Sequence, residues 1–103
     1  MLTAPEIKLA QRGLEERDGR LASAFQALAD PTRLKIFRLL VERQDICVTD
    51  VANVMGITVP AASHQLKYLE TAGLAKRERT GKTICYCIKK EDLLVKKVMG
   101  IMS

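Results

Sequence analysis

The first evidence for the fold is the stretch V-T-D-V-A-N-V-M-G-I-T-V-P-A-A-S-H-Q-L-K-Y-L-E-T-A-G-L, residues 48–74. It predicts a short helix from Asp50 to Met55, a tight turn at Gly56, and a second helix that ends at Gly73. The following residues 75–90, A-K-R-E-R-T-G-K-T-I-C-Y-C-I-K-K, predict two strands around the turn Thr80-Gly81-Lys82. Such a helix pair can present its second helix to the major groove of DNA, and a basic hairpin adds phosphate contacts. We therefore expect a winged helix-turn-helix that binds double-stranded DNA.

The second helix should begin after a Thr58 cap and carry Ala62, Leu66 and Leu69 on its buried side. Its other side is expected to hold the DNA-reading residues, which are Val59, Ser63, His64, Gln65 and Lys67. Gln65 suits an adenine edge, whereas Ser63 and Lys67 suit phosphate. His64, the only histidine, is interpreted as a DNA contact rather than a metal ligand. The cations of the hairpin should grip the DNA backbone or minor groove; they are Lys76, Arg77, Arg79 and Lys82.

The charge distribution supports a polyanionic partner. The chain has 103 residues and a net charge of +5, from 17 basic and 12 acidic residues. Residues 59–90 hold seven of the basic side chains but only two of the acidic ones, so the excess positive charge lies in the expected DNA-binding region. A solvated charged face is the simpler alternative interpretation.

The flanking segments are predicted to be helical. Residues 1–20 form an N-terminal extension for dimerisation, and residues 21–103 form the DNA-binding domain with a C-terminal dimerisation helix. A capping box at Thr3 and Glu6 starts the first segment, in which one long helix or two helices with a break near Gly19 both fit; we favour the break because helical glycines are costly. Asp30-Pro31 should start a central helix that ends at Arg43-Gln44-Asp45. The last helix is expected over residues 91–102, with Leu94, Val98 and Ile101 on its apolar side. Between residues 7 and 28, apolar residues recur at helical spacing, with few other apolar residues nearby. We expect this apolar stripe to dock onto another chain; it consists of Ile7, Leu14, Leu21, Phe25 and Leu28.

The chain contains three cysteines, Cys47, Cys85 and Cys87. If Ile46 and Val48 face inward along a short strand, Cys47 faces outward. Along residues 83–88 we expect Ile84, Tyr86 and Ile88 to face the core, so Cys85 and Cys87 also face outward. Three thiols on the outer face of one sheet would suit a soft ion such as As(III), Cd(II) or Cu(I), or thiol oxidation. Alternatively, each cysteine simply fills space as a small apolar residue.

Several classes of protein do not fit the sequence. No apolar run is long enough to span a bilayer, and the N-terminal residues lack the features of a secretory signal, so we expect a cytoplasmic protein with free thiols. An enzyme, for instance a thiol oxidoreductase using Cys85-Tyr86-Cys87, is not expected, because no Cys-x-x-Cys, phosphate loop or His–carboxylate set is present. No cofactor is expected to be required. The remaining alternative is a winged-helix module that binds another protein and has no inducer site.

The chain resembles the ArsR–SmtB family of small dimeric winged-helix repressors. The matching pieces are A-L-A-D-P-T-R-L-K-I-F-R-L-L (27–40), C-V-T-D-V-A (47–52), A-A-S-H-Q-L-K-Y-L-E-T-A-G-L (61–74) and G-K-T-I-C-Y-C-I (81–88). The resemblance implies a mainly α fold with a small antiparallel β-hairpin, dimerised through its first and last helices. It also implies a homodimer that represses transcription at a near-palindromic operator and is released by a metal, metalloid or thiol-reactive inducer.

The known inducer sites of this family are only partly matched. The usual thiol site, C-V-C-D-L-C or similar, keeps Cys47, but Thr49 and Ala52 replace the other two cysteines. The other common site uses Asp and His on the last helix, where this chain has no His and offers only Glu91 and Asp92. We therefore expect Cys47, Cys85 and Cys87 to form the inducer site, with As(III) as a candidate inducer.

Overall fold

The computed structural model describes the backbone of residues 1–102 and the side chains of residues 1–15 and 19–102. Ser103, the last residue of the expected DNA-binding domain, lies outside the described residues. The elements follow in the order α1 (Ala4–Leu28), α2 (Pro31–Glu42), β1 (Ile46–Cys47), α3 (Val48–Met55), α4 (Val59–Thr71), β2 (Ala75–Thr80), β3 (Thr83–Ile88) and α5 (Leu93–Met102). The mainly helical fold with a small antiparallel sheet is confirmed.

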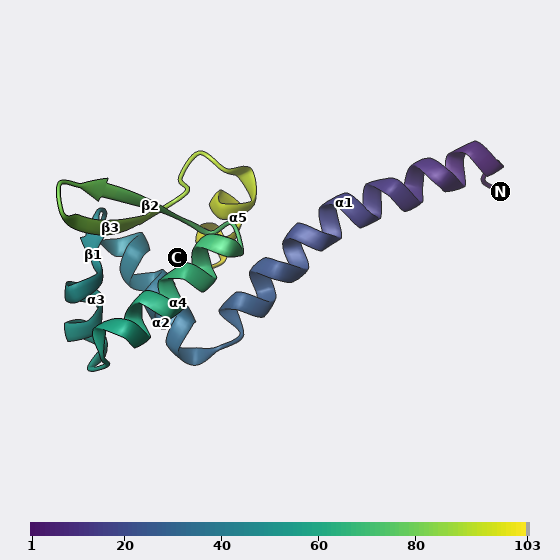
Figure 1. The fold of residues 1–103 in the computed structure, drawn as a ribbon. Coiled ribbons are helices and arrows are strands. Elements are labelled where there is room, and N and C mark those ends of the chain that lie inside the picture. Colours follow the sequence, from purple (N-terminus) through teal and green to yellow (C-terminus); the bar gives the residue numbers. More distant parts are fainter. Residues whose placement is uncertain (103) are drawn as a thin grey trace.

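Helix α1 projects from a small body as a single rod, so that the described chain measures 56 × 28 × 24 Å (Figure 1). The expected capping box is present, because the Thr3 hydroxyl accepts from the Glu6 N–H while the Glu6 carboxylate accepts from the Thr3 N–H. The expected break near Gly19 is wrong, since α1 is continuous. A helical glycine costs about 1 kcal/mol but does not block the helix, and the flanking residues 14–28 are mostly good helix formers.

Helix α2 is the centre of the core. Asp30 caps it by accepting from the Arg33 N–H at 3.0 Å, and Pro31 occupies its first turn, as expected. Ile36, Phe37 and Leu40 are fully buried, and α2 packs against α1, α4 and β3. Only the C-terminal part of α1, at Ala24 and Ala27, is buried in this core.

The three strands form one antiparallel sheet in the order β1-β3-β2. Ile46 pairs with Tyr86 and Cys47 with Cys85, so the short strand before α3 lies beside the second strand of the hairpin, as expected. Tyr86 and Ile88 face the core and are almost fully buried. The expectation for Ile84 is wrong: its side chain is 37% exposed, because it lies near the hairpin tip beyond the helices.

Two boundaries differ from expectation. Helix α3 begins at Val48 rather than Asp50, so that Cys47 is its N-cap residue. Helix α5 begins at Leu93 rather than Glu91, because the Asp92 carboxylate accepts from the N–H groups of Leu94 and Val95 and so caps the helix. The same carboxylate pairs with Arg20 at 2.7 Å, which connects α1 to the start of α5.

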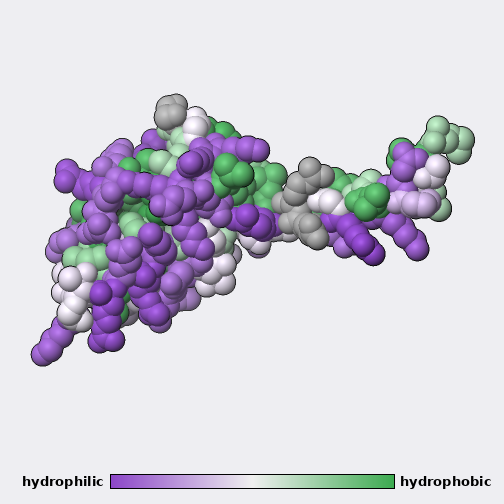
Figure 2. Space-filling view, turned by 90° about the horizontal axis from the view of Figure 1, so that it is seen from above, coloured by the Kyte–Doolittle hydropathy of each residue, from purple (hydrophilic) through white to green (hydrophobic). Residues whose placement is uncertain are grey.

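The buried side of α5 also differs from expectation. Val95 and Val98 face the core, whereas Ile101, which we expected beside Val98, is 74% exposed. Exposed apolar side chains also lie along α1, and Figure 2 shows hydrophobic residues on the projecting helix and where it joins the body. Within residues 1–102, no helix combines the length and apolar character needed to cross a membrane.

Candidate nucleic-acid interface and thiol cluster

Helix α4 presents a polar surface above a buried apolar side. The Thr58 hydroxyl accepts from the Ala61 N–H at 3.2 Å, and Gly73 follows the helix with a φ of 80°. The expected inward side is confirmed, because Ala62, Leu66 and Leu69 have no exposed surface. His64 and Lys67 are exposed and lie on the side of the helix opposite these three residues. Val59 is exposed at the start of α4, and Ser63 is half-buried.

Gln65 is held by a cation from α2. Its Oε1 accepts from Arg33 Nη1 at 3.3 Å, and the same guanidinium lies 3.9 Å from the centre of the Tyr68 ring. Arg33 Nε also donates to the carbonyl of Ala27 at 2.8 Å. Arg33 therefore joins α1, α2 and α4. Gln65 would have to exchange this partner for a base edge in order to read DNA.

The hairpin β2–β3 divides its cations between two faces. Residues opposite each other on paired strands share a face, and Arg77 pairs with Tyr86 and Arg79 with Ile84. Arg77 and Arg79 are therefore on the face that packs toward the helices. Lys76 lies on the other face, where its Nζ is 3.5 Å from Glu78 Oε1. Lys82 is exposed in the turn, which Gly81 makes possible with a φ of 64°.

The other face of the sheet, which we call the thiol face, carries Cys47, Cys85, Cys87, Lys76 and Glu78. The strand register puts all three cysteines on this face, as their alternation predicts. Cys85 and Cys87 are nonetheless largely buried on this face, being 9% and 7% exposed. On this face Cys85 is paired with Cys47 and Glu78, and Cys87 is paired with Lys76.

Cys47 and Cys85 form a close pair on the thiol face. Their sulfur atoms are 3.1 Å apart, and both cysteines are free thiols. The hydrogen bond with Cys47, together with burial, raises the pKa of the Cys85 thiol to about 11. Cys85 is therefore protonated at neutral pH. Because Cys47 is also the N-cap residue of α3, the pair connects the hairpin to the first helix of the helix-turn-helix.

Cys87 has different neighbours. Its thiol faces Glu78, with Sγ 3.9 Å from Oε1, and the carboxylate of Asp45 lies on the other side. Burial, followed by the nearby Glu78 carboxylate, raises the pKa of the Cys87 thiol. The geometry thus brings Cys47 and Cys85 together and joins Cys87 to two carboxylates.

Arg33, Asp45 and Glu78 were not predicted from the sequence as site residues. Arg33 lies within the D-P-T-R-L motif, which predicts its position at the start of α2 but not its contacts with residues of α4. Glu78 could have been found from the alternation of β2, once its register against β3 was known. The position of Asp45 could not be predicted from a sequence pattern, because this residue lies in the loop between α2 and β1 and its backbone adopts a left-handed φ of 54°.

The fold and sequence have counterparts among known proteins. A family described as "Bacterial regulatory protein, arsR family" matches residues 30–77. The cadmium resistance transcriptional regulatory protein CadC homolog of Staphylococcus aureus is 39% identical over 73 residues, which are 71% of this chain and 60% of that protein. The chain therefore spans less than two thirds of the length of this relative. The arsenical resistance operon repressor of Bacillus subtilis is 35% identical over 79 residues, covering 77% of this chain and 70% of that protein.

A solved structure agrees with these relatives. The homodimeric winged helix-turn-helix DNA-binding domain from Mycobacterium bovis superposes with a TM-score of 0.76 at 28% identity, covering 86% of this chain and 80% of that one. The sequence relatives are transcriptional regulators, not enzymes, in agreement with the expectation from the sequence.

Proposed function

Because the chain belongs to the ArsR family of bacterial regulatory proteins, we propose that it is a dimeric repressor that binds double-stranded DNA and is released by an inducer acting at its cysteines. The proposal that the chain binds DNA rests on the position of α4 beside the basic hairpin. Helix α4 is fixed by its buried side, and its exposed side bears His64 and Lys67. Two such helices in a dimer would lie about 34–36 Å apart, matching successive major grooves of a near-palindromic operator.

Each DNA-binding residue has a role that its position supports. His64 and Lys67 are exposed on α4 and are proposed to enter the major groove, with Val59 and Ser63 beside them. Gln65 contacts a base only after release from Arg33. On the hairpin, Arg77, Arg79 and Lys82 are free to contact phosphate, whereas Lys76 is already paired with Glu78.

Replacing Arg79 or Lys82 with alanine is expected to weaken binding to all DNA sequences. Each lost phosphate contact should reduce the slope of log K against log salt by about one unit. Fluorescence anisotropy with operator and random duplexes at several salt concentrations measures this slope. Lys8→Ala, on the projecting part of α1, is the matched control and should leave the slope unchanged.

Unchanged slopes in both hairpin variants would remove the wing from the DNA interface. A parent protein with no affinity for any duplex at low salt would favour the other function considered, a winged-helix module that binds protein.

The inducer site is proposed to be centred on Cys47 and Cys85, with Cys87 as an adjacent third thiol. Two sulfurs bound to one ion at about 2.3 Å each can be at most about 4.6 Å apart, and the observed 3.1 Å lies within that limit. Arsenous acid would condense with the two thiols, forming two As–S bonds and releasing two molecules of water. The product would bind the N-cap of α3 to strand β3 and so change the angle between the helix-turn-helix and the wing.

Replacing Cys47 and Cys85 together with serine is expected to give a repressor that binds its operator normally but no longer responds to arsenite. The measurement is operator binding by anisotropy as arsenite is titrated into parent and variant. The single variant Cys87→Ser is the control that shows whether the third thiol contributes. Equal release of DNA by the parent and the double variant would eliminate the cysteine pair as the sensor.

A further inference from the structure

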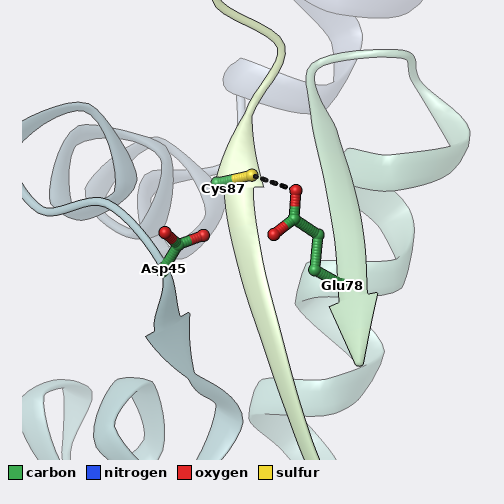
Figure 3. Close-up of side chains that lie close together, drawn as sticks. All are labelled: Asp45, Glu78 and Cys87. Carbon is green, nitrogen blue, oxygen red and sulfur yellow. Dashed lines mark hydrogen bonds between the residues drawn. The ribbon is translucent and has the colours of Figure 1, made fainter. Parts of the chain in front are cut away.

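Three potential metal ligands from different segments converge beside the wing. Asp45 precedes β1, Glu78 lies in β2 and Cys87 lies in β3 (Figure 3). One ligand atom from each residue lies within 4.8 Å of the others. They line a cavity of about 160 Å³, whose wall also includes Gln44 and Lys90. We call this set of three residues the wing cluster.

The fold explains why these residues meet. Strand β3 lies between β1 and β2, so a side chain on its thiol face has neighbours from both sides. Glu78 reaches Cys87 diagonally across the β2–β3 pair, because its direct partner is Cys85. Asp45 approaches from the other side. Cys87 is 7% exposed, and its sulfur lies between the two carboxylates (Figure 3).

We propose that the wing cluster binds one divalent cation of borderline softness, such as Zn²⁺ or Cd²⁺, with the Cys87 thiolate and one oxygen each from Asp45 and Glu78 as ligands. One sulfur and two oxygens fit the ligand preferences of these ions, and water would complete a tetrahedron. The ligand atoms of such a tetrahedron are about 3.5 Å apart, so small side-chain rotations would bring the present atoms into place.

The charges of the cluster favour a cation. The cavity is lined by three carboxylates, those of Asp45, Glu78 and Glu91, and by two ammonium groups, those of Lys76 and Lys90, so its lining carries one net negative charge. The Lys76 ammonium is 3.5 Å from Glu78. Binding would transfer the Cys87 proton to solvent and put a doubly charged ion between three anionic ligands. The site is distinct from the Cys47–Cys85 pair in its donors and in the segments it joins. An ion here would tie both strands of the wing to the connection that enters β1.

The test is a titration of the full chain with Cd²⁺ alone. A variant with Cys47→Ser and Cys85→Ser retains only the Cys87 thiol, so any sulfur-to-cadmium charge-transfer absorption must come from the wing cluster. We expect one ion per subunit by equilibrium dialysis, an ultraviolet charge-transfer band, and release of one proton. Adding Cys87→Ser should abolish the band, and Zn²⁺ should compete with Cd²⁺.

The carboxylates are tested without disturbing buried residues. Asp45→Asn and Glu78→Gln should each weaken Cd²⁺ binding by about tenfold or more. Glu91→Gln is the matched control, because its carboxylate lines the same cavity but is not part of the wing cluster. Loss of the band on replacing Cys47 and Cys85, or equal effects of Glu78→Gln and Glu91→Gln, would overturn the proposal. DNA binding measured without metal reports separately on the proposed repressor function.

Discussion

Replacing Phe37 with alanine is expected to lower the free energy of unfolding by about 3–5 kcal/mol. Phe37 has no exposed surface and lies on α2, the helix that contacts α1, α4 and β3. The cavity left by the ring would therefore weaken the packing of α2 against these neighbouring elements. Since small domains have total stabilities of about 5–15 kcal/mol, this single change would remove a large share of the stability of the protein.

Urea denaturation followed by circular dichroism measures the effect of Phe37→Ala. Val54→Ala is the matched control, because Val54 is a helical residue whose side chain is 64% exposed. Substitutions at such surface positions usually change stability by less than about 0.5 kcal/mol. Equal shifts of the two denaturation midpoints would contradict the central role of α2.

Helix α4 could be predicted closely from the sequence because its signals agree with one another. Thr58 and Pro60 mark its start, Gly73 marks its end, and Ala62, Leu66 and Leu69 recur at helical spacing. Each signal is local, so none depends on distant parts of the chain. The face of the three cysteines was predictable for the same reason, since alternation along a strand is local.

Features that depend on distant contacts could not be predicted. The wing cluster requires the register of β2 against β3 and the approach of Asp45 beside them, and neither follows from local pattern. The exposure of Ile84 depends on where the helices end beneath the sheet. Arg33 illustrates the same limit: its motif was recognised, but its contacts with Gln65 and Tyr68 arise only when α2 and α4 pack.

Local preference also misled in two places. The glycine at position 19 suggested a break in α1, but its cost is small beside the favourable residues around it. The start of α5 was placed two residues early, although Asp92 is a good N-cap residue and its side chain does cap the helix. The cost of the helical glycine was overestimated in the first case, and the capping role of Asp92 was overlooked in the second.

Replacing Phe25 with glutamate is expected to prevent the proposed dimerisation and to weaken operator binding by about 10²- to 10⁴-fold. Phe25 is 52% exposed and continues a stripe with Leu21, Leu14 and Ile7 along one side of α1. Ile7, Leu14 and Leu21 are 44%, 56% and 36% exposed, and Ile101 of α5 is 74% exposed. We attribute this exposure to a partner subunit that covers the stripe in solution.

Sedimentation velocity and operator anisotropy on the same samples test this prediction. Leu9→Glu is the matched control, because Leu9 is on the same helix and is 67% exposed. Leu9 is two residues from Ile7, which corresponds to a rotation of about 200° around the helix, so Leu9 lies on the side opposite the stripe. Leu9→Glu should remain dimeric and bind the operator normally. Loss of dimerisation lowers operator affinity because binding at one half-site no longer brings a linked second subunit to the other half-site. Binding of each subunit to random duplex depends mainly on phosphate contacts, so it should change far less. A Phe25→Glu protein that stays dimeric would assign the stripe to a different partner.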